Sequence, residues 1–291
     1  LKGTDMTYAL PVNTADRPIT IIGGGTLGRR IALMLSLQGA EVRVYDTSLA
    51  VARAAVEYIA THRHRAVEEL GGSPAVRLAA KDNLVEALRD SWLVVEAVPE
   101  KLGLKQAIFA DLDQLAAPDA VLASNSSSFS SAEFVGGLSS PERVLNMHFY
   151  MPPEVRSVEL MSSGHTDPGI LELLMGELPK YALKPHLVRK QSTGFIFNRI
   201  WAAIKRESLL VVAEGVAEPQ DVDALFAEVF KAETTPFRFM DEVGLDVVLD
   251  IENHYCEVAG IENKSAAMLQ AYIAKGWLGV KSGRGFYNDY S

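Results

Sequence analysis

The chain has 291 residues, of which 48% are apolar and 22% are charged, and its formal net charge is −9. This length gives room for a substantial core and two domains, while the acidic balance argues against general nucleic-acid binding. No apolar run reaches the roughly 18 residues that a membrane helix needs, and the only cysteine, Cys256, excludes an internal disulfide and a multi-thiolate zinc site. We therefore expect a soluble, cytoplasmic protein that binds a small molecule and no metal, nucleic acid or membrane.

The first expected strand, 19–22, runs directly into a G-x-G-x-x-G pattern and then into a helical pattern. Gly23 lets the chain turn tightly, Gly25 lets backbone N–H groups approach a pyrophosphate, and Gly28 lets the following helix pack closely on the strand. The phosphates are expected at the start of that helix, where unpaired N–H groups favour negative charge. We leave residues 1 to about 17 out of the expected fold. The dinucleotide-binding residues predicted in this turn are Gly23, Gly25, Thr26, Leu27 and Gly28.

A second strand, 41–45, places Asp46 roughly 20 residues beyond the glycines, where a carboxylate can hydrogen-bond both ribose hydroxyls of NAD. The same charge would repel a 2′-phosphate, so the sequence favours NAD(H) over NADP(H). Arg43 lies at the wrong part of the strand to reverse this preference, although Arg53 could lie nearby. A strand-turn-helix unit that binds nothing is the alternative, and the combination of strand, glycines, helix and acid argues against it.

The next segments alternate between helical and strand patterns. A long helix, 48–70, carries His62, Arg63, His64 and Arg65 on an expected exposed face, which is either merely solvated or in contact with substrate phosphates. Alternating strands and helices predict an α/β fold with a Rossmann-type, doubly wound, mostly parallel sheet and ligands at the carboxyl ends of its strands. The remaining expected elements are strands near 76–79 and at 92–98, 121–124, 143–148 and 157–161, a helix capped by Asp82, and a helix over 102–115.

The character of the chain changes at about Gly194, because no strand pattern follows and amphipathic helices are expected instead. We predict an NAD-binding domain over 18–190 and an all-helical C-terminal domain over 191–291, joined by a short polar connector at 189–193. The helices expected in the second domain cover 195–215, 219–230, 240–259 and 265–275.

Polar side chains at strand ends are the candidates for catalysis. His148 ends an apolar strand, and Glu159 lies in the next strand. If those strands pair, the carboxylate can orient one ring nitrogen and leave the other to exchange a proton with a substrate hydroxyl, as hydride transfer requires. Ser127 and Asn198 could hydrogen-bond the same oxygen. The structural alternatives are a buried histidine with no chemical role, a serine that only caps a turn, and an asparagine that only bridges two domains.

These motifs together resemble the NAD-dependent L-3-hydroxyacyl-CoA dehydrogenases, in order and in approximate spacing, over nearly the whole chain. The resemblance implies a Rossmann-type domain, a helical domain that forms a homodimer interface and the substrate cleft, and a role in fatty acid metabolism. The segments that carry it are the glycine turn, 94–100, 124–128, 147–149, 158–160, 194–199 and the C-terminal 281–287.

Position by position, the resemblance makes His148 the catalytic acid/base and Glu159 its orienting carboxylate, with Ser127 and Asn198 around the reacting oxygen. It also implies three dinucleotide contacts, Glu100, Lys105 and Lys281.

The chain departs from the family pattern in places that bear on the substrate. The catalytic histidine is typically followed by Phe-Phe-Asn-Pro, but here by Phe149, Tyr150, Met151 and Pro152. A thioether thus replaces an amide near the nicotinamide, and Glu69 stands where a CoA-contacting lysine would align.

The leading interpretation is therefore interconversion of 3-hydroxyacyl and 3-oxoacyl groups on CoA with NAD(H). Alternatives are the same chemistry on a carrier-protein thioester, a free 3-hydroxy acid or a secondary-metabolite ketone, or a non-catalytic NAD-binding protein with a structural or sensing role.

Overall fold

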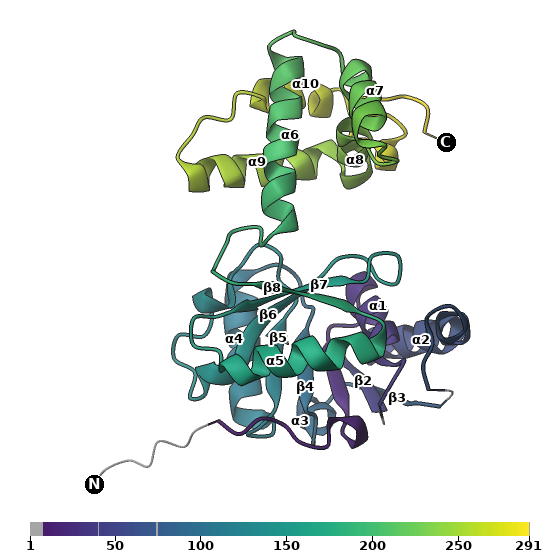
Figure 1. Ribbon diagram of the computed structural model, residues 1–291, viewed down its shortest axis with the longest axis vertical. Coiled ribbons are helices and arrows are strands. Elements are labelled where there is room, and N and C mark those ends of the chain that lie inside the picture. Colours follow the sequence, from purple (N-terminus) through teal and green to yellow (C-terminus); the bar gives the residue numbers. More distant parts are fainter. Residues whose placement is uncertain (1–7, 40, 74, 291) are drawn as a thin grey trace. The chain divides into compact units, whose positions relative to one another are not determined.

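The computed structural model describes residues 8–39, 41–73 and 75–290. Its internal contacts divide the chain into two compact units, the first ending at Ile196 and the second beginning at Phe197. The first unit combines a sheet with helices, and the second is helical (Figure 1). Within the described residues, no helix has both the length and the apolar character that crossing a membrane requires.

The first unit is built on one eight-stranded sheet with the order β3-β2-β1-β4-β5-β6-β7-β8. All neighbouring strands run parallel except β6 and β7, which are antiparallel. The predicted Rossmann-type, mostly parallel sheet is confirmed. Its strands are β1 (Ile19–Ile22), β2 (Glu41–Tyr45), β3 (Arg77–Lys81), β4 (Leu93–Glu96), β5 (Val121–Ser124), β6 (Val144–Phe149), β7 (Ser157–Ser162) and β8 (Lys184–Val188).

Helices cover both faces of this sheet, which explains the continuous apolar runs of its central strands. In β4, Val95 packs in the cluster that includes α1 (Thr26–Leu35), α2 (Leu49–Leu70) and α5 (Pro168–Glu177). The next residue back, Val94, packs on the other face against α3 (Leu84–Leu88) and α4 (Leu102–Leu115). Consecutive residues of a central strand therefore pack into the hydrophobic clusters on opposite faces of the sheet.

The second unit contains α6 (Phe197–Ala213), α7 (Pro219–Phe230), α8 (Pro236–Val243), α9 (Leu245–Ala259) and α10 (Ala266–Ala274). Its core includes Leu209, Phe237 and Leu269. The single helix expected over 240–259 is wrong, because Gly244, with φ of 98°, ends α8 and starts α9. Short 3-10 turns complete the two units: η1 (Thr14–Asp16), η2 (Ser131–Glu133), η3 (Pro141–Arg143), η4 (Leu178–Tyr181) and η5 (Val280–Ser282).

The expectation that residues 1 to about 17 lie outside the fold is wrong for the part of this segment that the structure describes. Residues 1–7 lie outside the described residues, but 8–17 belong to the fold. Tyr8 donates its hydroxyl to the carbonyl of Asp119 at 2.7 Å, and Arg17 donates to both carboxylate oxygens of Asp119 at 2.5 and 2.9 Å. These polar contacts follow no hydrophobic periodicity, so the sequence pattern did not reveal them.

Arg63 corrects the expectation of an exposed basic face on α2. It is only 9% exposed, and it donates to the carbonyls of Ser36 at 3.0 Å and Ser73 at 2.5 Å. Burial lowers the pKa of its guanidinium. Arg63 is thus a structural residue that ties α2 to two loops, while Arg65 on the same helix is exposed and pairs with Glu69 at 2.7 Å.

Replacing Arg63 with methionine should lower the free energy of unfolding by about 2 kcal/mol, because the buried carbonyl of Ser36 and the part-buried carbonyl of Ser73 lose their donor. Arg65→Met is the matched control, since an exposed ion pair contributes about 0.5 kcal/mol or less. Urea denaturation of both variants measures the difference. If Arg63→Met unfolds like the wild type but binds a phosphorylated substrate more weakly, Arg63 has the phosphate-contacting role and not the structural one.

Candidate active site

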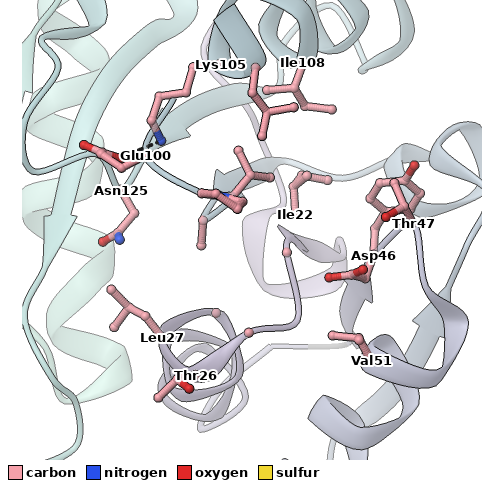
Figure 2. Close-up of a pocket in the computed structure, with 18 of the residues that line it drawn as sticks. Ile22, Thr26, Leu27, Asp46, Thr47, Val51, Glu100, Lys105, Ile108 and Asn125 are labelled. Carbon is pink, nitrogen blue, oxygen red and sulfur yellow. Dashed lines mark ion pairs between the residues drawn. The ribbon is translucent and has the colours of Figure 1, made fainter. Parts of the chain in front are cut away.

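A cavity of about 890 Å³ opens in the first unit at the carboxyl ends of the central strands. Residues from the ends of β1, β2, β4, β5 and β6 and from the starts of α1 and α4 line it. Figure 2 shows Asp46 on one side of this space and Glu100 with Lys105 on the other. The lining includes most of the residues singled out by the sequence: Gly23, Gly25, Thr26, Leu27, Gly28, Asp46, Glu100, Lys105, Ser127 and His148.

The glycine turn after β1 has the shape that a pyrophosphate needs. Gly23 has φ of 102°, and a Cβ there would lie 2.7 Å from the carbonyl oxygen of Ala97. A Cβ on Gly28 would lie 1.9 Å from the carbonyl oxygen of Gly23, so α1 can approach β1 only with glycine at that position. A Cβ on Gly25 would meet no protein atom within 4 Å, which leaves the start of α1 open to a ligand. The residues present therefore fit a dinucleotide.

Two backbone N–H groups hold the carboxylate of Asp46 directly after β2. One carboxylate oxygen accepts from the backbone N–H of Gly24 at 3.0 Å, and the other accepts from the N–H of Ser48 at 3.0 Å. The carboxylate therefore links the glycine turn to the start of α2 while it lines the cavity. This position suits a carboxylate that accepts from ribose hydroxyls.

Replacing Asp46 with serine should raise the Kd for NADH about tenfold or more, because hydrogen bonds to a charged group contribute about 1.5–3 kcal/mol. Binding of NADPH should weaken less, or improve, since the repelling charge is gone. Quenching of protein fluorescence measures both constants. Glu57→Gln, which removes a carboxylate from the exposed face of α2, is the control. An unchanged preference for NADH over NADPH in Asp46→Ser would show that another residue sets the specificity.

A network of charges around the buried Lys105 lies at the opposite side of the cavity. Lys105, 1% exposed, donates to both carboxylate oxygens of Glu96 at 2.9 and 3.1 Å and forms an ion pair with Glu100 at 3.1 Å. Ser124 at the end of β5 also donates to Glu96 at 2.6 Å. Sequence reasoning gave Glu96 no role, although a carboxylate inside an apolar strand was a signal for one, because buried charges need partners.

Glu100 connects this network to the loop that follows β5. It accepts from the Ser126 hydroxyl and from the backbone N–H of Ser128, the latter at 3.0 Å. Burial acts to raise the pKa of Glu100, but the Ser126 hydrogen bond and the charge of Lys105 outweigh it, so that this pKa is lowered. The two bonds fix the loop on either side of Ser127, which is exposed and lines the cavity.

Asn125 joins the same loop to the end of β6. Its side-chain oxygen accepts from the N–H of Phe149 at 2.8 Å, one residue after His148. The serine loop and the histidine are therefore fixed relative to each other by a side chain that sequence reasoning did not select. Its position beside the Ser-Ser-Ser run was the available signal.

His148 and Glu159 form a buried couple across β6 and β7. They are directly opposite in the antiparallel register, and Nδ1 of His148 lies 3.1 Å from Oε2 of Glu159. The two residues are 5% and 2% exposed. Nε2 has no hydrogen-bond partner among the described residues of the first unit, although His148 lines the cavity. A carboxylate on Nδ1 fixes the tautomer and leaves Nε2 for proton exchange.

Two more groups donate to Glu159. The hydroxyl of Tyr150 donates to Oε2 at 2.7 Å, and the backbone N–H of Ile196 donates to Oε1 at 2.9 Å. The ring of Phe195 stacks on His148 with centroids 5.1 Å apart. The segment up to Ile196 thus contributes to the histidine's surroundings from within the first unit.

Two of the expected site residues belong to the second unit. Asn198 lies at the start of α6, and Lys281 lies in η5, where its ammonium pairs with Asp246 at 2.5 Å. The roles that the family resemblance implies for both remain proposals. Among the residues that the structure describes, no group of three or more histidine, cysteine, aspartate or glutamate side chains could hold a metal ion.

Both units of the chain match a known protein family. Residues 18–190 match the family described as 3-hydroxyacyl-CoA dehydrogenase, NAD binding domain, and residues 194–289 match its C-terminal domain. The chain belongs to the 3-hydroxyacyl-CoA dehydrogenase family. The first unit is therefore an NAD-binding domain, and the protein is an oxidoreductase that acts on a small molecule.

Individual relatives show how broad this 3-hydroxyacyl-CoA dehydrogenase family is. A 3-hydroxybutyryl-CoA dehydrogenase of Mycobacterium tuberculosis is 31% identical over 95% of this chain and 99% of its own. The 3-hydroxyacyl-CoA dehydrogenase-like protein LAM1 of Cochliobolus heterostrophus is 45% identical over 51% of this chain, but that match covers only 32% of LAM1. A solved diketoreductase, described for its catalysis of dicarbonyl compounds, is 28% identical with a TM-score of 0.81, covering 94% of this chain and 99% of its own.

Proposed function

We propose that this protein interconverts 3-hydroxyacyl-CoA and 3-oxoacyl-CoA thioesters with NAD(H), using His148 and Glu159 as its acid/base couple. The observation that carries the proposal is the position of His148 and Glu159 relative to the cavity. A histidine with one nitrogen held by a buried carboxylate lines the same cavity as the dinucleotide turn and Asp46. A protein that only binds NAD needs no such couple, which argues against a structural or sensing role.

The proton steps follow from the hydrogen bonds. NADH, when bound, supplies the hydride to the carbonyl carbon. In that direction, His148 gives the proton on Nε2 to the carbonyl oxygen as negative charge develops there. Glu159 holds the other nitrogen throughout and stabilises the imidazolium before the transfer. Ser127, presented by the loop that Glu100 fixes, supplies a hydroxyl near the same oxygen. In the oxidation direction, neutral His148 takes the proton from the alcohol.

A second candidate substrate class is a ketone or 3-hydroxy acid without CoA. The likeness to a diketoreductase favours it, and so does Met151, which stands where the family resemblance implies an amide near the nicotinamide. Glu69 also favours it, because it stands where the family resemblance implies a lysine that contacts CoA. Its carboxylate pairs with Arg65 on the surface of α2. The hydride and proton chemistry would be the same.

Absorbance of NADH at its nicotinamide band distinguishes these possibilities. We expect rapid loss of absorbance with acetoacetyl-CoA and slow or no loss with free acetoacetate and with a simple diketone. Faster turnover of the diketone would transfer the proposal to the second substrate class. Failure with every 3-oxo compound tested would contradict both.

We further propose a homodimer, which the family resemblance implies, and a cytoplasmic location. Sedimentation equilibrium of the full chain should give twice the mass of 31.7 kDa. A monomer at micromolar concentration would contradict this part of the proposal.

A further inference from the structure

The ring of Phe195 is stacked on the imidazole of His148. The two rings are close to parallel, at 27° with centroids 5.1 Å apart, whereas the ring of Tyr150 meets the same imidazole at 59°. Phe195 is only 3% exposed, and it packs with Met161 of β7 and Val188 of β8. The phenyl ring is therefore held in a hydrophobic cluster of the first unit while it contacts the imidazole.

The backbone of Phe195 adopts a conformation that most side chains disfavour. Its φ is 55°, in the left-handed region, where a Cβ causes strain and where glycine or asparagine is the more usual residue. Gly194 before it has φ of 75°, and the N–H of Phe195 donates to the carbonyl of Ser192 at 3.0 Å, so the chain turns tightly here. Strained residues persist where surrounding contacts over-determine them, and they cluster at functional sites.

This strained turn brings two groups onto the couple of His148 and Glu159. The ring of Phe195 contacts the imidazole, and the next backbone N–H, that of Ile196, donates to Oε1 of Glu159 at 2.9 Å. Glycine or asparagine would adopt the turn with less strain, but neither carries an aromatic ring. A phenylalanine in this conformation therefore indicates a use for the ring itself.

We propose that Phe195 is a positioning residue that fixes the plane of the His148 imidazole, so that Nε2 keeps its direction toward the substrate oxygen. The contact between Nδ1 and Glu159 holds one atom, but a hydrogen bond tolerates a range of angles, so the imidazole could still tilt about it. A flat ring stacked on the imidazole removes this freedom. Proton transfer needs an aligned donor and acceptor, so its rate depends on this plane. The inference rests on the proposed role of His148.

The first test compares Phe195→Leu, which keeps apolar bulk but loses the flat ring, with Phe195→Tyr, which keeps it. In Phe195→Leu, kcat for reduction of acetoacetyl-CoA should fall about tenfold or more, because a misaligned acid delivers its proton more slowly. KM and the Kd for NADH should stay within about twofold, since no ligand contact is lost. Phe195→Tyr should retain most of the wild-type kcat, because Phe195 lines a cavity of about 160 Å³ with room for a hydroxyl.

Phe134→Leu is the matched control. Phe134 is 2% exposed and contacts the ring of Phe109, with centroids 4.7 Å apart, outside the lining of the dinucleotide cavity. This substitution should lower the melting temperature as Phe195→Leu does, yet leave kcat unchanged. An unchanged kcat in Phe195→Leu, or an equal loss in Phe134→Leu, would overturn the proposal. A raised KM with an unchanged kcat would also overturn it, because Phe195 would then be a substrate contact.

A second measurement needs no turnover. In the NAD-free protein, NMR relaxation of the ring carbons of His148 reports the motion of the imidazole on the picosecond-to-nanosecond timescale. The signals are assigned by their loss in His148→Gln. The order parameter should fall in Phe195→Leu and hold in Phe195→Tyr and Phe134→Leu. An equally ordered imidazole in Phe195→Leu would refute the role of Phe195. If instead the wild type reduces no 3-oxo compound, the proposed function fails while this measurement still decides the inference.

Discussion

Replacing His148 with glutamine should lower kcat for reduction of a 3-oxoacyl-CoA at least about 100-fold, the lower range for loss of a general acid. Glutamine retains a hydrogen-bonding group and similar length, but it cannot release a proton to the forming alkoxide. NADH consumption at saturating substrate measures kcat. Fluorescence titration should show an unchanged Kd for NADH, because the imidazole's assigned role is in the proton step.

His64→Gln is the control for this substitution. His64 lies on α2 with its side chain 86% exposed and contacts Glu68 at 3.6 Å, so its loss should leave kcat within about twofold of the wild type. If His148→Gln retains the wild-type rate, the acid/base assignment is wrong even though the protein is an oxidoreductase.

Replacing Gly25 with alanine should weaken NADH binding at least tenfold, or about 1.4 kcal/mol, without a change in thermal stability. The added methyl meets no protein atom within 4 Å, so the fold has no reason to move. It would instead occupy the space in which a pyrophosphate approaches the start of α1. Titration calorimetry with NADH and a thermal melt measure the two effects.

Two further glycine substitutions are controls for Gly25→Ala. Gly103→Ala adds a methyl that also meets nothing within 4 Å, but on α4 and outside the cavity lining, so NADH binding should persist. Gly28→Ala would place a Cβ 1.9 Å from the carbonyl oxygen of Gly23 and should destabilise the first unit as well. Wild-type affinity in Gly25→Ala would mean that the phosphates do not bind at this turn.

The sequence predicted the centre of the sheet well because buried parallel strands are continuous apolar runs. The predicted strand at 121–124 and the helices at 102–115 and 219–230 have the bounds that the structure gives for β5, α4 and α7. The edge of the sheet was missed. β8 alternates between exposed and partly buried residues and contains Pro185, which an edge position tolerates.

Local signals were also overlooked or misplaced. α5 begins with Asp167, which accepts from the N–H of Gly169 at 2.8 Å, and with Pro168 at its first position, a pairing typical of helix starts. The cap of α3 is Asn83 and not Asp82, since its side chain accepts from the N–H of Glu86. The α5 start could have been recognised from its residue types, whereas the choice between Asp82 and Asn83 depends on which side chain reaches the N–H of Glu86.

The candidate site was predictable where it depends on sequence order and unpredictable where it depends on register. The glycine turn and Asp46 are consecutive features of one β-α-β unit. Pairing of His148 with Glu159 instead requires β7 to reverse direction against β6, which the sequence left as a condition. The contribution of Tyr150 to that pair was not foreseen, because a tyrosine beside an aromatic strand end is typical of a core residue.

Transfer of deuterium from NADH tests the central claim most directly. The protein should be incubated with acetoacetyl-CoA and NADH deuterated at C4 of the nicotinamide, separately in each of the two stereochemical forms. The account predicts that one form, and not the other, delivers deuterium to C3 of the 3-hydroxyacyl product, with one NADH oxidised for each alcohol formed. Consumption of NADH with no deuterium at C3, from either form, would contradict hydride transfer between this cofactor and a 3-oxoacyl group.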